Sequence, residues 1–392
     1  MRTAMRNEGR AAVIKADMPR GMFAGERGMK NRIKTPLGIV LLCLLCGLRT
    51  FAAEPDAARE TAALRREYDA YLERLNGINR RPEIAQNGFC VLEEQVFDVT
   101  LENLGEVVFV PALDEKYHRL ILFFADKEEN IVYKTDRLAM NFVRTGSLAQ
   151  MVQGLSAVSF QDVNGDLRTD IVLIASCSRG AQTKKPYQVG EVLFAEREGF
   201  YRDFRVSDKI NRFGMNKSVD FILAYVRDFH STEFLYTAKT MQELTRNGFL
   251  VIDEQSYWRE FEKLGKLLVV PGSITIADFE IFMIYLVNEE GTIVWSFQPM
   301  GMHDNLYALR GINCRDIDGD GMKDLVVLAR YSDEVAPGQQ EIVSDYCIYY
   351  QRTGGFAEDG ELKKHFSCDE NTKMEDLVKE ARAYWGYIEG AD

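Results

Sequence analysis

The sequence predicts a β-rich α+β protein made of two similar domains in tandem, and three observations support this. Short runs rich in Val, Ile, Leu and aromatic residues, bounded by Gly, Asn and Asp, recur along most of the chain and indicate strands. Several segments of residues 87–230 recur in residues 247–392, which indicates an internal duplication. One Asp- and Gly-rich nonapeptide stands before a strand-like run in each copy.

The N-terminal residues 1–53 have the order of a secretory signal. Basic residues precede an apolar run at 36–48, and the small residues Ala52 and Ala53 follow it. The apolar run is too short for a comfortable membrane span, so we expect cleavage near Ala52 or Ala53 and no membrane span in the mature form. An uncleaved N-terminal anchor is the alternative, and Met29 is an alternative translation start.

The charge balance after residue 53 indicates an acidic protein outside the cytoplasm. That part of the chain holds 38 Lys and Arg and 57 Asp and Glu, a net charge of −19. Such an excess disfavours nucleic acid and anionic membrane surfaces as partners. Five cysteines remain there without a Cys-x-x-Cys pair, so one or two disulfides and single buried thiols both stay open. We therefore expect a secreted protein or one of the periplasm or cell envelope.

A helix is expected before the first repeat, in residues 54–86. Within 56–77 the apolar residues follow helical spacing, and they are Leu64, Tyr68, Tyr71, Leu72 and Leu75. This stretch predicts an amphipathic helix that ends near Gly77 and is followed by a linker.

The two repeats align over several segments in the same order. Residues 87–95 recur as 247–255, and the Leu-Gly segment that starts at Leu104 recurs at Leu264. These matches define domain 1 as 87–230 and domain 2 as 247–392, with 231–246 as a linker.

Each repeat is expected to contain about seven strands and a terminal helix. In the first repeat the strands are expected near 89–97, 106–111, 119–125, 130–135, 155–161, 170–177 and 189–196, with a helix near 216–227. In the second they are expected near 249–258, 265–270, 279–287, 292–297, 308–314, 324–331 and 345–351, with a helix near 373–386.

The nonapeptides carry oxygen side chains at positions one, three, five and nine, a spacing that suits a metal ion. The side-chain ligands of the first loop are Asp162, Asn164, Asp166 and Asp170, and those of the second are Asp316, Asp318, Asp320 and Asp324. A backbone carbonyl at position seven, from Arg168 or Met322, completes each set. A hard cation that takes six to eight oxygens fits such a loop and offsets the repulsion between the carboxylates, so calcium is expected.

The loops differ from an EF-hand and are similar to another calcium loop. Position twelve is Leu173 or Val327 where an EF-hand has Glu, and a β-branched run follows instead of a helix. The pattern resembles the FG-GAP/VCBS repeat proteins, whose calcium loop precedes a β-strand. Because the two loops are too far apart for propeller blades, the chain more closely resembles a group of extracytoplasmic bacterial proteins with one or two VCBS-like units. The resemblance implies metal binding.

The two loops are not expected to bind equally. The second has four Asp side chains, whereas Asn164 replaces one in the first. Leu167 also stands where the second loop has Gly321, and a left-handed backbone there would cost Leu about 1 kcal/mol. We expect weaker calcium binding at the first loop.

No catalytic motif accompanies the loops. The four His are scattered, and His-Glu-x-x-His, Gly-x-Ser-x-Gly and phosphate-loop patterns are absent from the sequence. The acidic pairs at 93–94 and 253–254 flank repeated strands and are typical of a solvated sheet edge. We favour calcium-dependent binding or adhesion to a protein or glycan, without catalysis. The alternatives are an extracytoplasmic hydrolase acting on polysaccharide and a structural envelope assembly factor.

Overall fold

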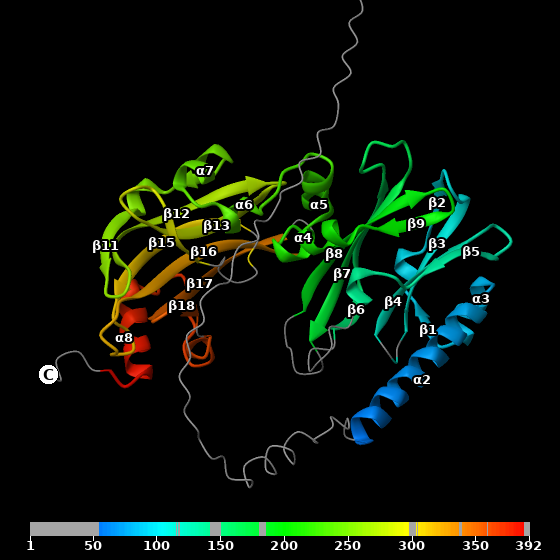
Figure 1. Cartoon of the computed structure of the whole chain (residues 1–392), viewed down its shortest axis with the longest axis horizontal. Coiled ribbons are helices and arrows are strands. Elements are labelled where there is room, and N and C mark those ends of the chain that lie inside the picture. The colour runs from blue at the N-terminus through cyan, green and yellow to red at the C-terminus, as the bar shows by residue number, and fades with distance from the viewer. Residues whose placement is uncertain are drawn as a thin grey trace, which may run out of the picture. The chain divides into compact units, whose positions relative to one another are not determined.

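The computed structural model shows a β-rich protein with four antiparallel sheets (Figure 1). It describes residues 55–114, 116, 118–141, 150–179, 186–297, 303, 305–336, 339–358 and 360–387. Strands hold 48% of the residues and helices 23%, so the β-rich α+β class is confirmed. The predicted signal segment and its cleavage point lie outside the described residues.

By its internal contacts the chain divides into Met1–Tyr71 and Leu72–Asp392. The described part of the first unit is the start of helix α2 (Pro55–Gly77), where Tyr68 and Tyr71 stack with ring centroids 5.9 Å apart. The second unit contains every sheet. Both sequence repeats therefore lie in one compact unit.

The first half of this unit contains strands β1 to β9. They are β1 (Phe89–Val91), β2 (Phe97–Leu101), β3 (Gly105–Asp114), β4 (Arg119–Ala125), β5 (Ile131–Thr135), β6 (Gln150–Gln161), β7 (Asp170–Arg179), β8 (Tyr187–Glu196) and β9 (Gly199–Arg202). Its helices are α3 (Arg81–Gln86), η1 (Glu93–Gln95), η2 (Ala139–Asn141), α4 (Phe204–Arg212) and α5 (Val219–Val226). The sheets have the orders β1-β3-β4-β5, with β2 on β3, and β6-β7-β8-β9.

The second half has the same strand orders. Its strands are β10 (Leu250–Val251), β11 (Tyr257–Phe261), β12 (Gly265–Ile276), β13 (Phe279–Val287), β14 (Ile293–Phe297), β15 (Asn305–Arg315), β16 (Asp324–Ala336), β17 (Gln339–Arg352) and β18 (Gly355–Glu358). Its helices are α6 (Phe234–Thr237), α7 (Met241–Arg246), η3 (Asp253–Gln255), η4 (Leu362–Lys364) and α8 (Met374–Tyr384). The sheets run β10-β12-β13-β14, with β11 on β12, and β15-β16-β17-β18.

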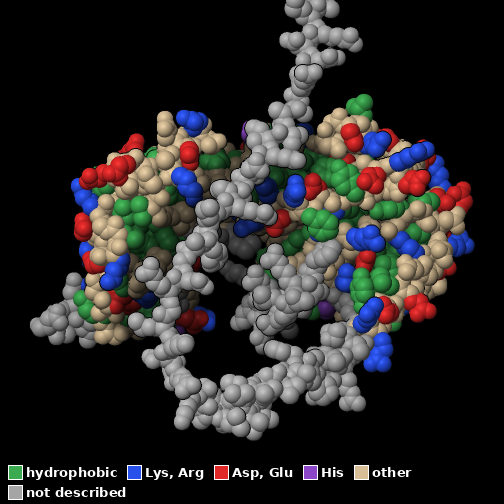
Figure 2. All heavy atoms as spheres, in the orientation of Figure 1, with side chains coloured by type: hydrophobic (Ala, Val, Ile, Leu, Met, Phe, Trp, Pro, Cys, Tyr) green, Lys and Arg blue, Asp and Glu red, His purple; other side chains and the backbone are tan. Residues whose placement is uncertain are grey.

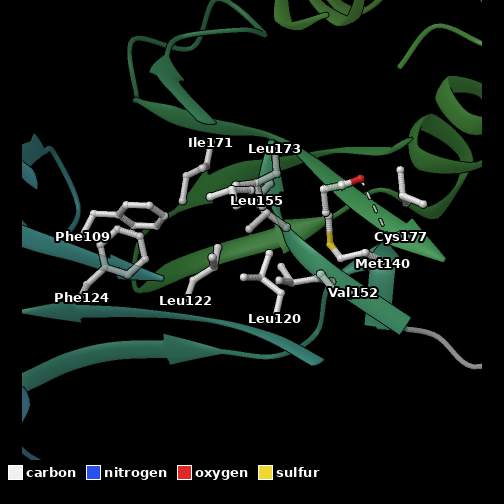
Figure 3. Packing of buried hydrophobic residues seen from close by; sticks show 14 of the residues in the cluster. Phe109, Leu120, Leu122, Phe124, Met140, Val152, Leu155, Ile171, Leu173 and Cys177 are labelled. Atoms are coloured by element: carbon white, nitrogen blue, oxygen red, sulfur yellow. Dashed lines mark hydrogen bonds between the residues drawn. The ribbon is translucent and has the colours of Figure 1, made fainter. Parts of the chain in front are cut away.

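In each half a hydrophobic core fills the space between two sheets. In the first half Phe109 and Phe124 from one sheet face Ile171 and Leu173 from the other (Figure 3). The corresponding core of the second half joins β11–β14 to β15–β17. Burying these side chains removes apolar surface from water, which is the main force that holds two sheets face to face.

Helices cover the outer sheet faces. Helix α8 packs Leu377 and Ala381 against β16 and β17. Helix α5 contributes Ile222 to the core that covers β7 and β8, and Phe221 to the core that covers β12 and β13. Because one helix serves both cores, the two halves are joined by packing as well as by the chain.

Several elements differ from the sequence-based expectation. Residues 231–246, expected as a linker, contain α6 and α7, which bury Leu235 and Leu244 in the core with β12 and β13. The single strand expected at 89–97 is divided into β1, η1 and β2. Helix α4 and the short hairpin strands β9 and β18 were not expected. Short elements of this kind carry too few residues for a clear periodic pattern.

The surface of the described residues is mixed in charge. Acidic and basic side chains alternate over the visible face (Figure 2). No helix in the described part of the chain is both long and apolar enough to span a membrane.

Candidate metal centre

Each acidic nonapeptide forms a tight loop between two paired strands. The first connects β6 to β7, and the second connects β15 to β16. The ninth residue of each loop, Asp170 or Asp324, is already the first residue of the following strand. The predicted order of loop and strand is thus present in both halves.

The aspartate at position one organises the backbone of its loop. Asp316 Oδ1 accepts a hydrogen bond from the Gly319 amide at 2.8 Å, and its Oδ2 accepts one from the Gly321 amide at 3.0 Å. Asp162 accepts the equivalent bonds from the Gly165 and Leu167 amides at 2.7 and 2.9 Å. Desolvation raises the pKa of Asp162, but these amide hydrogen bonds outweigh it and hold the pKa below its usual value.

Two left-handed residues give each loop its curvature. In the second loop both are glycines, Gly319 with φ of 79° and Gly321 with φ of 80°. In the first loop Gly165 has φ of 78°, and Leu167 is held at 65°. Leu167 is also 85% exposed, so packing contributes little to offset the cost of that conformation. Position six is therefore left-handed in both loops, which is the condition under which Leu167 carries a conformational cost.

The aspartate at position nine ties the loop to the neighbouring strand. Asp324 is fully buried, and its oxygens accept hydrogen bonds from the Ile317 and Gln351 amides, each at 2.8 Å. Asp170 is buried in the same way and bonds the Val163 and Ala195 amides. Burial raises the pKa of Asp324 to about 7, and the nearby Asp318 and Asp320 add to the shift.

The second loop brings carboxylates together. One ligand oxygen from each of Asp316, Asp318 and Asp324 lies within 4.8 Å of the other two. Asp320 is not part of this group. Its Oδ2 pairs with Arg352 at 3.1 Å, and Asp318 Oδ2 pairs with the same guanidinium at 2.7 Å. Within the described residues, the aspartates of the first loop do not form such a group of three.

The remaining predicted ligands lie in the same turns. Asn164 and Asp318 each accept a hydrogen bond from the residue at position five, at 3.0 and 3.4 Å. The position-seven residues, Arg168 and Met322, donate their amides to Asp166 and Asp320 at 3.0 and 2.8 Å. The structure thus places every predicted residue in a loop of matching hydrogen bonds.

Two glutamates that the sequence analysis missed support the loops from a neighbouring turn. Glu102 accepts a hydrogen bond from the Thr169 amide at 2.7 Å, and Glu262 accepts one from the Lys323 amide at 2.8 Å. Glu262 also pairs with the Lys323 ammonium group. Each glutamate stands two residues before a repeated Leu-Gly, at Leu104 or Leu264, and that shared position was the available signal.

The donor chemistry of the second loop fits a hard divalent cation. The gathered atoms are carboxylate oxygens, which calcium prefers, and soft sulfur or imidazole ligands are not part of the group. A cation there would neutralise charges that otherwise repel one another.

The other residues weighed for catalysis lie elsewhere. The acidic pairs at 93–94 and 253–254 form the exposed short helices η1 and η3. Among the described residues that line a cavity of about 680 Å³ beside α6 and β12, the one carboxylate is Glu233, which is paired with Lys209. It does not supply the two facing carboxylates that glycoside hydrolysis requires.

No family model matches the sequence, and no curated protein matches it.

Proposed function

We propose that this is an extracytoplasmic calcium-binding protein, secreted or held in the periplasm or cell envelope. Its two halves are interpreted as homologous domains of the VCBS/FG-GAP type, each with one calcium loop. The recurrence of strand order in the two halves and of the same hydrogen bonds in both loops supports this proposal.

The observation that carries the calcium proposal is the group formed by Asp316, Asp318 and Asp324. Three carboxylates with oxygens within 4.8 Å repel one another when all are ionised, and a divalent cation between them would offset that repulsion more than the single charge of Arg352 beside Asp318 does. Binding energy for the cation would add to folding stability, because an unfolded loop does not hold the oxygens together. The expected role of calcium is therefore structural.

We propose binding or adhesion to a protein or glycan as the use of this scaffold, without catalysis. Tyr384 and Trp385 at the end of α8 are 40% and 41% exposed, and Trp258 on β11 is 41% exposed. Partly exposed aromatic rings suit stacking on sugars or contacts with a protein partner.

Calorimetric titration with calcium tests the proposal. We expect two sites per chain in the wild type. Asp318→Ala removes the position-three oxygen from the second loop, which the first loop keeps as Asn164, so one site should be lost. Asp166→Ala should remove the other, and the double variant should bind no calcium. Titrations that release no heat and show no saturation in the folded wild type would refute the proposal.

A further inference from the structure

We propose that the Arg352 side chain competes with the cation for the carboxylates of the second loop. At the equivalent position beside the first loop stands Glu196, whose charge attracts a cation. The inference rests on the proposed calcium function and concerns what sets the affinity of each loop. Arg352 and Glu196 lie outside the nonapeptides, yet both would control how tightly a cation binds.

The Arg352 guanidinium reaches two of the predicted ligands at once. Its Nη2 lies 2.7 Å from Asp318 Oδ2, and its Nη1 lies 3.1 Å from Asp320 Oδ2. Nη1 also donates to the Gln351 carbonyl at 2.8 Å, and the guanidinium lies 5.3 Å from the ring centre of Tyr350. A planar fork held on several sides loses little freedom when it grips the loop.

These contacts use oxygens that a bound cation needs. The second oxygens of Asp318 and Asp320 already accept the amides of Asp320 and Met322. A divalent ion must therefore share its carboxylates with the guanidinium or displace it. Sharing places like charges within a few ångströms, where they repel strongly, so displacement of Arg352 is expected. The Arg352 side chain is 41% exposed and can turn toward water.

The first loop has the opposite charge at the equivalent position. Ala195 and Gln351 donate their amides to the position-nine aspartates of their loops, and the next residues are Glu196 and Arg352. Glu196 also pairs with Gly199 in its hairpin as Arg352 pairs with Gly355 in the other. Glu196 is exposed. Burial raises the pKa of Tyr201, and the negative charges of Glu196, Asp166 and Asp170 raise it further. A carboxylate here attracts a cation instead of competing with it.

The consequence is that the nonapeptides alone do not set the order of affinities. Four aspartates and Gly321 favour the second loop, whereas Arg352 lowers its affinity and Glu196 raises that of the first. Removing the guanidinium should therefore reveal the full affinity of the second loop.

The test is calcium calorimetry on the full chain, with one loop silenced at a time. In an Asp166→Ala background, Arg352→Ala should bind calcium at the second loop about tenfold more tightly, the change expected when two half-exposed charge-assisted contacts no longer compete. Arg352→Lys keeps the charge without the fork and should give an intermediate gain. Arg246 is an exposed residue of α7, so Arg246→Ala removes the same charge elsewhere on the protein and should leave the affinity unchanged.

The reciprocal change tests the first loop. In an Asp318→Ala background, which removes the position-three ligand of the second loop, Glu196→Arg should weaken calcium binding about tenfold or more. Circular dichroism checks that each variant is folded. If Arg352→Ala does not fold, Arg352→Lys takes its place in the test. Unchanged affinity in Arg352→Ala, with calcium still bound by the wild type, would overturn the competition but leave the calcium proposal intact. If neither the wild type nor Arg352→Ala binds calcium, the proposed function itself fails.

Discussion

Leu167→Gly and Gly321→Leu measure the free energy that a left-handed backbone at position six costs a residue with a side chain. Both residues have a left-handed φ, 65° for Leu167 and 80° for Gly321. Leu167 is 85% exposed, and a Cβ added at Gly321 meets no atom within 4 Å. Leu167→Gly therefore leaves no buried cavity, and a side chain at Gly321 starts in open space, so we expect the conformational energy of the backbone to dominate both changes.

The expected size follows from two opposing contributions. A non-glycine residue pays about 1–2 kcal/mol in the left-handed conformation. Glycine loses about 0.5–1 kcal/mol more conformational freedom on folding. Leu167→Gly should therefore raise the free energy of unfolding by about 0.5–1 kcal/mol, and Gly321→Leu should lower it by a similar amount. Each change corresponds to a shift of the melting temperature by about 2 °C.

The assay is reversible chemical denaturation in the presence of a chelator, so that metal binding does not contribute. Leu167→Ala is the control, because it keeps a Cβ at the same φ and should change stability by less than about 0.5 kcal/mol. If Leu167→Gly destabilises the protein, or if Leu167→Ala stabilises it as much, the strain assigned to this position is wrong.

Three further predictions concern residues around the loops and in the cores. Glu262→Gln should weaken calcium binding at the second loop several-fold, because its carboxylate orders the Lys323 amide at 2.8 Å, and calorimetry against Glu260→Gln on the preceding strand β11 will show whether the effect is local. Gly355→Ala should destabilise the protein by more than about 2 kcal/mol, because the new Cβ would lie 2.2 Å from Trp295 at a φ of 133°. Gly265→Ala, where no atom lies within 4 Å, is its control, and equal losses in urea denaturation would contradict the packing argument. Burial alone lowers the pKa of His303, but hydrogen bonds to Asp345 and Asp333 raise it overall. The contribution of His303 to stability should therefore be full below the pKa of the unfolded state, about 6.5, and disappear as the pH rises through the pKa of the folded state. The stability difference between wild type and His303→Asn should thus be larger at pH 6 than at pH 9, and a pH-independent difference would refute this account.

The sequence was most informative where a local pattern determines the structure. The strands following each loop were expected from β-branched runs, and β7 and β16 begin at the residues predicted, Asp170 and Asp324. The cost to Leu167 depended on a left-handed backbone at position six, where the second loop has Gly321, and Leu167 has that conformation. Such features depend on neighbours in the chain, so one sequence is enough to predict them.

Features that depend on distant residues were missed. Glu262 lies 61 residues from Lys323, and Arg352 lies 34 residues from Asp318, so no local spacing relates them to the loop. The helices of 231–246 were taken for a linker because α6 and α7 are short, and their burial comes from β12 and β13. Tertiary packing decides these elements, and periodicity within a few residues does not reveal it.

Thermal unfolding with and without a calcium chelator, on the wild type and on Asp318→Ala, tests most directly whether a cation at the second loop holds the fold. Chelation should lower the melting temperature of the wild type clearly and that of Asp318→Ala much less, because the variant lacks one of the three gathered carboxylates. Identical melting of the wild type with saturating calcium and with chelator would contradict the account.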